Sequence, residues 1–308
     1  MMDALSLAGL GHNTLIVLAG ATALGVAAGM VGCFMVLRRR ALLSDALSHA
    51  TLPGIVIAFM AATALGLEGR SLPLLLLGAA ASGALSVLCI QAITRWTRLT
   101  EDVAIGAVLS VFFGIGVVLL SVVQEMPGAN AAGLKGFILG QTAAMHTAEA
   151  ASLGGLALVA ALAVTLLYKE FTLLSFDPGF TRAAGWPAGR FDLALMALVT
   201  LVTVIGLQTV GLVLIIALLI TPAAAARFWT DRLPVMLAVA ALFGGVSGGV
   251  GALLSARFHD IPAGAVIVLV ASALFAFSLL LAPGRGLLGR SLRRARLRDD
   301  LVAGRRAT

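Results

Sequence analysis

The chain has 308 residues, of which 60% are hydrophobic and only 11% are charged, and its mean hydropathy is +1.08. Soluble domains are nearer half apolar and a quarter charged, so this composition excludes an ordinary soluble domain and predicts an integral membrane protein. The net charge of +7 does not require a nucleic-acid partner, because most of the arginines flank apolar segments, where such residues orient a membrane protein. We therefore expect membrane lipid as a partner and no nucleic acid.

Long apolar segments follow one another along the chain, as is typical of membrane-spanning helices, which satisfy their own backbone hydrogen bonds in lipid. They lie near residues 14–37, 42–67, 72–94, 103–123, 150–168, 191–207, 208–226, 233–254 and 262–282. The pair 191–207 and 208–226 is short for two crossings of a hydrocarbon core of about 30 Å, so we expect eight to nine crossings. The predicted fold class is an all-α polytopic integral membrane protein, with a transmembrane domain over 1–284 and an Arg-rich tail over 285–308.

The lysines and arginines test this topology, because positive residues favour cytoplasmic loops. Nine crossings put 18 of the 21 positive residues on one side, among them the three residues Arg38–Arg40 and all eight arginines of the tail. Arg70, Lys135 and Arg257 fall on the other side. The distribution predicts an outside N-terminus and a cytoplasmic C-terminus, with Arg38–Arg40 in water.

Glycines recur at four-residue spacing within the apolar segments, as in the pairs Gly25/Gly29 and Gly244/Gly248. This spacing lets helix backbones approach closely. The stretch 244–251 contains no lysine and lies inside an apolar segment, so it favours helix packing over phosphate binding. A Gly-x-x-x-x-Gly-Lys-Ser/Thr loop is absent from the sequence, and we expect no ATPase activity of the chain itself.

Asp45 and His49 are ionisable residues in the interior of the apolar segment 42–67. On a helix their spacing puts both side chains on one face, one turn apart. An ionised side chain at membrane depth costs roughly 2.5–3.5 kcal/mol even on insertion scales, so such residues usually serve a function. Three interpretations remain open: a divalent transition-metal site, a proton relay, or a helix-capping aspartate with a packing histidine.

Pro53, followed by Gly54, predicts a helix break beside this pair, because proline has no N–H to donate to the carbonyl of His49. A broken helix offers oxygen and nitrogen donors to a cavity, as in transporters. One aspartate and one histidine do not close a metal site. Two copies meeting at a twofold axis would supply two nitrogens and two carboxylates, which suits zinc or, with water, manganese.

A second distinctive stretch follows the apolar segment 208–226. Pro222 predicts a helix break, a short helix fits residues 223–230, and Pro234 predicts the start of the next crossing. Such a short helix could dock in a groove on a soluble partner. The polar stretch 169–187 has a similar mixture of small residues, aromatics and charges.

These motifs resemble those of the manganese/zinc/iron-chelate permeases of ABC importers. The similar segments, in chain order, are Val36–Arg39, Leu43–Ala50, Leu52–Gly54, Thr100–Asp102, Ile105–Gly106, Leu139–Gly140, Val210–Leu214, Ala217–Arg227 and Asp260–Ala265. They span the chain from about residue 14 to 282. Ser44 departs from the pattern, because the family usually has glycine there.

The resemblance implies a metal-type ABC importer permease fold and a dimer with a second permease copy in a bacterial cytoplasmic (inner) membrane. It also implies a cytoplasmic ABC ATPase subunit and an extracytoplasmic metal-binding protein as partners. Asp45 and His49 would contact the transported metal, with no permanently bound cofactor. The ATPase-coupling segment would contain Pro222, Ala226, Arg227, Trp229, Asp231 and Arg232.

The cargo would be a divalent metal moved by alternating access. Zinc is favoured on imidazole affinity alone, but one Asp–His pair also fits manganese and iron. The alternative is a proton-coupled secondary metal transporter that uses Asp45 and His49 as its relay.

Overall fold

A computed structural model describes residues 11–65, 72–125, 145–258, 261–282 and 286–287. Their regular secondary structure is helical, without strands in any of these ranges, which confirms the all-α fold class. In this part of the chain, nine segments are long and apolar enough to cross a membrane. They are α1 (His12–Leu37), α2 with α3 (Ala41–Ala50 and Leu52–Ala64), α4 (Leu72–Trp96), α5 (Glu101–Glu125), α7 (Thr147–Leu166), α10 (Ala188–Val210), α11 (Leu212–Trp229), α12 (Leu233–Arg257) and α13 (Ala263–Leu281).

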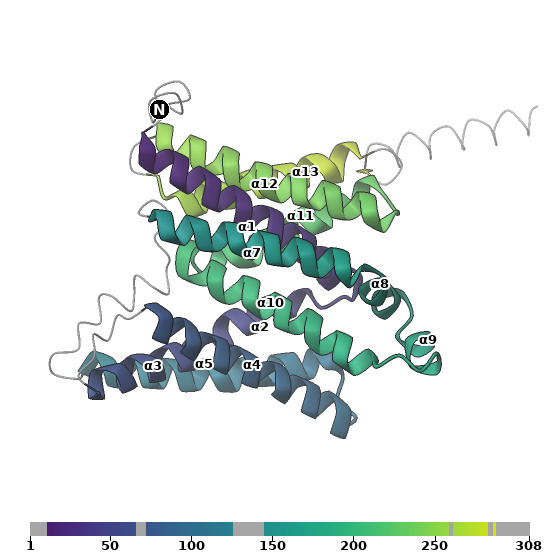
Figure 1. The fold of residues 1–308 in the computed structure, drawn as a ribbon, viewed down its shortest axis with the longest axis horizontal. Coiled ribbons are helices and arrows are strands. Elements are labelled where there is room, and N and C mark those ends of the chain that lie inside the picture. Colours follow the sequence, from purple (N-terminus) through teal and green to yellow (C-terminus); the bar gives the residue numbers. More distant parts are fainter. Residues whose placement is uncertain (1–10, 66–71, 126–144, 259–260, 283–285, 288–308) are drawn as a thin grey trace, which may run out of the picture.

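The helices form two groups joined by a middle layer (Figure 1). Helices α1, α11, α12 and α13 pack together at the top of the view, and α3, α4 and α5 pack together at the bottom. Helices α2, α7 and α10 lie between the two groups. The short helices α8 (Tyr168–Phe176) and α9 (Pro178–Ala183) lie at the end where α7 finishes and α10 begins.

The predicted close approach of glycine-bearing helices occurs between α1 and α12. A methyl group added at Gly25 would overlap the backbone carbonyl of Gly244, and one added at Gly29 would overlap the carbonyl of Ala240. Gly248 meets the backbone of Ala21 in the same way. The glycine spacing therefore brings the two backbones together, which supplies van der Waals contact where lipid removes the hydrophobic driving force.

The short segments predicted at 191–207 and 208–226 form two separate helices, α10 and α11. Helix α10 ends at Val210, and Gly211 follows with a φ of +85°, a conformation that costs glycine little. The predicted break at Pro222 is wrong, because α11 continues through this residue to Trp229. The predicted helix over 223–230 is therefore the last part of α11. Pro234 lies in the first turn of α12, as predicted.

Several expectations concern residues that lie outside the described ranges. They include Arg70, Lys135, the segment Leu139–Gly140 and almost all of the tail 285–308. The division into a domain over 1–284 and a tail therefore stays a prediction.

Candidate functional site

Asp45 and His49 lie on the same face of helix α2, as predicted. The Nε2 atom of His49 lies 3.4 Å from the Oδ1 atom of Asp45, one helical turn away. The Asp45 side chain is 42% exposed and the His49 side chain 25% exposed, whereas Leu43, Leu47 and Ala50 of the same helix are buried. The buried face anchors α2 and leaves the carboxylate and the imidazole together on the accessible face.

The capping interpretation of Asp45 is wrong. Helix α2 begins at Ala41, with Arg40 at the cap position, so Asp45 lies inside the helix. His49 does have a packing partner, since its ring meets the ring of Phe113 on α5 edge-on, with centroids 4.8 Å apart. Phe113 covers one side of the imidazole, and Asp45 lies beside its Nε2 atom. The His49 ring is therefore held by an apolar contact with Phe113 and a polar contact with Asp45.

The predicted break beside the pair occurs at Thr51, between α2 and α3. Proline starts helices well, and Pro53 is in the first turn of α3. The sequence predicted a free carbonyl at His49. This carbonyl is not free, because a backbone N–H at the Thr51 cap donates to it. The neighbouring carbonyl of Ala50 instead accepts a hydrogen bond from the hydroxyl of Ser82 on α4, at 2.5 Å.

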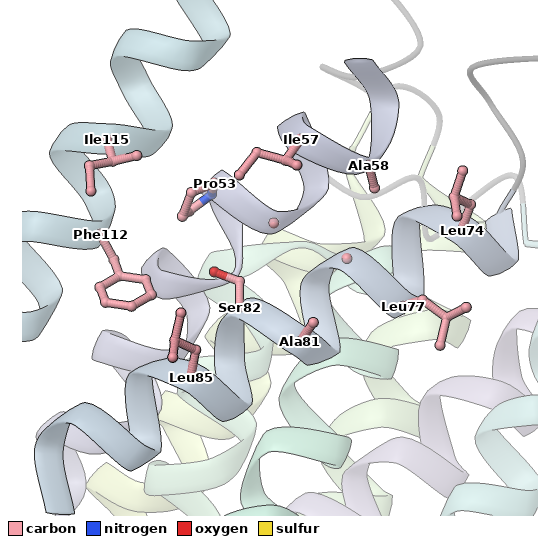
Figure 2. A pocket seen from close by; sticks show the side chains of 12 residues that line it. Pro53, Ile57, Ala58, Leu74, Leu77, Ala81, Ser82, Leu85, Phe112 and Ile115 are labelled. Atoms are coloured by element: carbon pink, nitrogen blue, oxygen red, sulfur yellow. The ribbon is translucent and has the colours of Figure 1, made fainter. Parts of the chain in front are cut away.

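The break faces an apolar hollow of about 520 Å³ between α3, α4 and α5 (Figure 2). Pro53 and Ile57 line it from α3, Ser82 and Leu85 from α4, and Phe112 from α5. Gly54 and Gly78 also line the hollow and meet backbone to backbone, so a methyl group on either residue would overlap the other's carbonyl. The broken helix is thus locked to α4 by a glycine contact and by the Ser82 hydrogen bond.

The residues before α2 form an ion-pair cluster. Asp192, near the start of α10, pairs with both Arg38 and Arg40, and Arg40 also pairs with Glu101 of α5 at 2.5 Å. The arginine side chains are only 11% and 12% exposed, so the expectation that Arg38 and Arg40 lie in water is wrong. Arg39 between them adopts a left-handed conformation with φ +58°, which turns the chain sharply from α1 into α2.

This cluster fixes the start of α2. Burial lowers the pKa of the Arg38 guanidinium from its ordinary value, and the charge of Asp192 acts in the opposite direction. The cost of burying two guanidinium groups is offset only while their carboxylate partners remain in place. Asp192 and Glu101 therefore set where α2 begins, and with it the position of Asp45.

The segment predicted to contact an ATPase is only partly on the surface. Pro222 and Ala226 are buried, and Arg227 pairs with Asp231 at 2.8 Å, one turn further on. The indole of Trp229 donates to the hydroxyl of Ser278 on α13 at 3.0 Å, and its ring stacks on Phe277.

The donor set for a metal is small within one chain. Among the described residues, no group of three or more histidines, cysteines or carboxylates is arranged to hold a metal ion. Asp45 and His49 offer one carboxylate and one imidazole. A transition metal usually takes four or more ligands, so this pair suits a site that is completed from elsewhere or one that binds its ion in transit.

Comparison with known proteins decides the family. The model of the ABC 3 transport family matches residues 12–282. The chain belongs to the ABC 3 transport family. It is 43% identical over 286 residues to the manganese transport system membrane protein MntC of Bacillus subtilis, covering 93% of this chain and 65% of that relative. It is 44% identical over 282 residues to the zinc transport system membrane protein TroC of Treponema pallidum, covering 91% and 93% of the two chains.

Solved structures give the same assignment. PsaBC from Streptococcus pneumoniae, determined in complex with a Fab, matches with a TM-score of 0.77 at 31% identity, over 96% of this chain and 98% of that one. The inward-facing structure of a putative metal-chelate type ABC transporter matches with a TM-score of 0.62 at 15% identity, over 86% and 84% of the chains. This second likeness concerns the fold alone. The predicted metal-type ABC importer permease fold is therefore confirmed.

In this ABC 3 family chain, the sequence interpretation missed three side chains that contact α2 or the residues just before it. Asp192 is the only acid between residues 191 and 226, which is a signal that the sequence did offer. Phe113 and Ser82 are ordinary members of apolar segments, and nothing in the sequence distinguishes them from their neighbours. Only the packing of α2 against α4 and α5 brings them to the site.

Proposed function

We propose that this chain is the permease subunit of an ABC importer that carries a divalent transition metal, manganese or zinc, into the cytoplasm. The arrangement that carries the proposal is the Asp45–His49 pair, which is partly exposed beside a broken helix inside a membrane-spanning segment. Imidazole nitrogen and carboxylate oxygen bind both ions, and neither ligand alone selects between them. Relatives named for manganese and for zinc support this cargo class.

The ion would pass through a site formed by two copies of the permease. Each copy contributes one carboxylate and one imidazole, and two copies together supply four protein ligands. The exposure of both side chains supports this arrangement, because a partner's pair can approach them. A site split between two subunits also opens when the subunits move apart, which suits release of the ion.

A separate cytoplasmic ATPase would drive this movement, and an extracytoplasmic metal-binding protein would deliver the ion. Two segments are candidates for contact with the ATPase: the end of α11 with Arg227 and Trp229, and the α8–α9 segment. The α8–α9 segment presents Phe176, Phe180 and Trp186 to solvent. Exposed aromatics of this kind are typical anchors in protein interfaces, which favours α8–α9 as the larger contact.

The test is uptake by the assembled transporter in sealed vesicles. Asp45→Asn keeps the shape of the side chain and removes its negative charge, and His49→Ala removes the imidazole. We expect each variant to lose manganese or zinc uptake while still assembling with its ATPase, because these ligands act in transit. The matched control is His146→Ala with Glu149→Gln at the cap of α7, which should transport normally.

The outcomes separate the candidate mechanisms. Normal ATP-driven uptake by Asp45→Asn together with normal uptake by His49→Ala would remove the pair from the pathway. A proton relay would give uptake that depends on a proton gradient and continues without ATP. Competition between the two metals in the parent transporter identifies the preferred cargo.

A further inference from the structure

Two hollows outside the Asp45–His49 site lie along the same pair of helices, α4 and α10. The first is a polar cavity of about 690 Å³, where α4 ends and α10 begins. The second is an apolar groove of about 430 Å³, which lies further along the same two helices. Helices α4 and α10 contact each other and run in opposite directions, so both hollows lie along one seam.

The helical register places the residues that line the two hollows on the same faces of α4 and α10. On α4, the groove is lined by Ala80, Ala84, Val87 and Leu88, and the cavity by Gln91, Thr94 and Arg95. On α10, the groove is lined by Val204, Leu201, Thr200, Ala197 and Leu193, and the cavity by Asp192, Gly189 and Ala188. Steps of three and four residues keep to one helix face. The first cavity residue on α4 is about 4.5 Å beyond the last groove residue along the axis.

Small side chains explain why the groove exists. Ala80 and Ala84 on α4 and Ala197 on α10 are exposed, and larger exposed side chains, Leu88 and Leu201, stand beside them. The groove runs about 12 Å along α4 from residue 80 to residue 88, at 1.5 Å per residue. Its walls offer van der Waals contact to a thin apolar chain and almost no polar groups.

The polar cavity carries an excess of positive charge. Its two carboxylates, Asp192 and Glu101, are already paired with Arg38 and Arg40. Arg95 of α4 and Arg182 of α9 also line the cavity, and both are exposed. Within the described part of the chain, Arg95 and Arg182 form no ion pair. Two guanidinium groups are therefore available to an anion, and their charge disfavours a metal cation.

We propose that this seam binds an anionic phospholipid, with its phosphate at Arg95 and Arg182 and one acyl chain along the α4–α10 groove. Guanidinium groups match phosphate oxygens in charge and geometry. Basic pockets between membrane-spanning helices, near the membrane surface, are typical sites for anionic headgroups. The groove favours a lipid as the source of the phosphate. A free anion would make no contact with the apolar groove, whereas the acyl chain of a lipid would fill it.

The proposed lipid site lies apart from the Asp45–His49 pair, and its unpaired charges are positive. Asp45 and His49 are absent from the lining of both hollows. The bound lipid would bridge the end of α4, the start of α10 and α9, and so would hold α9 near the membrane surface. The proposal does not depend on which ion is transported, and its test measures lipid directly.

The experiment titrates the full-length permease in detergent with phosphatidylglycerol and with phosphatidylcholine of the same acyl chains. Native mass spectrometry counts the bound lipid. We expect phosphatidylglycerol to bind more tightly, and the double variant Arg95→Gln, Arg182→Gln to weaken it about 25-fold, at about five-fold for each arginine. The matched control is Arg98→Gln with Arg190→Gln, because these exposed arginines lie near the same helix ends without lining the cavity. This control should bind as the parent does.

A second variant tests the groove. Ala84→Phe fills it and should weaken both lipids alike, and thermal unfolding checks that the protein is intact. Equal affinity for the two lipids, or an unchanged double variant, would overturn the proposal. Displacement of phosphatidylglycerol by millimolar inorganic phosphate would assign the cavity to a soluble anion instead. Disulfide formation between two copies carrying Ala84→Cys would assign the groove to a second permease, again against a lipid.

Discussion

Ser82 on α4 donates a hydrogen bond from its hydroxyl to the backbone carbonyl of Ala50, the residue directly after His49. The oxygen atoms are 2.5 Å apart, and Ser82 is buried. The bond satisfies a carbonyl at the end of α2, where the helical ladder is interrupted. The last turn of α2, which carries His49, is therefore held by a side chain from another helix.

Ser82→Ala should loosen this turn. Loss of a buried hydrogen bond costs about 1 kcal/mol and leaves the Ala50 carbonyl without its partner from α4. We expect a several-fold weaker apparent affinity for the transported metal, with assembly unchanged, in uptake measurements over a range of metal concentrations. Ser86→Ala is the control, because Ser86 is also buried and donates only to its own helix, at Gly83. Equal effects of the two substitutions would contradict a positioning role for Ser82.

Asp192→Asn should destabilise the start of α2. Asp192 accepts from both Arg38 and Arg40, and its neutral replacement leaves two largely buried guanidinium groups with only Glu101 as a counter-charge. Breaking a buried pair of this kind costs about 3 kcal/mol. We expect a clear fall in the thermal unfolding temperature of the purified permease. Asp177→Asn is the control, because asparagine caps a helix about as well as aspartate, and it should cost well under about 1 kcal/mol at the exposed cap of α9. If Asp192→Asn lowered the unfolding temperature no more than Asp177→Asn does, the ion-pair cluster would not be what stabilises the start of α2.

Helix α12 allows a direct test of sidedness. Arg232 and Arg257 lie at its two ends, and both are exposed. The arginine distribution predicts that Arg257 is outside and Arg232 is inside. In a background without Cys33 and Cys89, Arg257→Cys should react with an impermeant thiol reagent added to intact cells, and Arg232→Cys should react only after permeabilisation. The opposite pattern would invert the proposed orientation.

The two candidate ATPase contacts make different predictions. If α8–α9 is the larger contact, Phe180→Ala should weaken ATPase binding about ten-fold or more, as expected for an exposed aromatic anchor. Arg227→Glu should then have a smaller effect, because Arg227 is already paired with Asp231. Co-purification of the two subunits at increasing salt measures both. If Arg227→Glu or Trp229→Ala weakened ATPase binding more than Phe180→Ala does, the main contact would be the end of α11.

Much of the fold follows from the sequence, because membrane insertion has simple physical rules. A spanning helix must satisfy its own backbone and expose apolar side chains, so hydropathy predicted eight to nine crossings, and the described residues contain nine helical segments long and apolar enough to cross, close to the predicted positions. The glycine pairs predicted close helix packing because only glycine permits such an approach. The spacing of Asp45 and His49 predicted their contact, since four residues on a helix place two side chains one turn apart.

Only the tertiary structure decided the surroundings of the pair. A proline removes one backbone hydrogen bond, and a membrane helix tolerates this loss where neighbouring groups satisfy the freed carbonyl. Helix α11 runs through Pro222, whereas the chain breaks before Pro53. Arginines leave water when carboxylates from distant segments reach them, and Asp192 is 152 residues from Arg40. Ser82, Phe113 and Asp192 come from three different helices. Local spacing cannot encode such long-range contacts, because they depend on how complete helices pack.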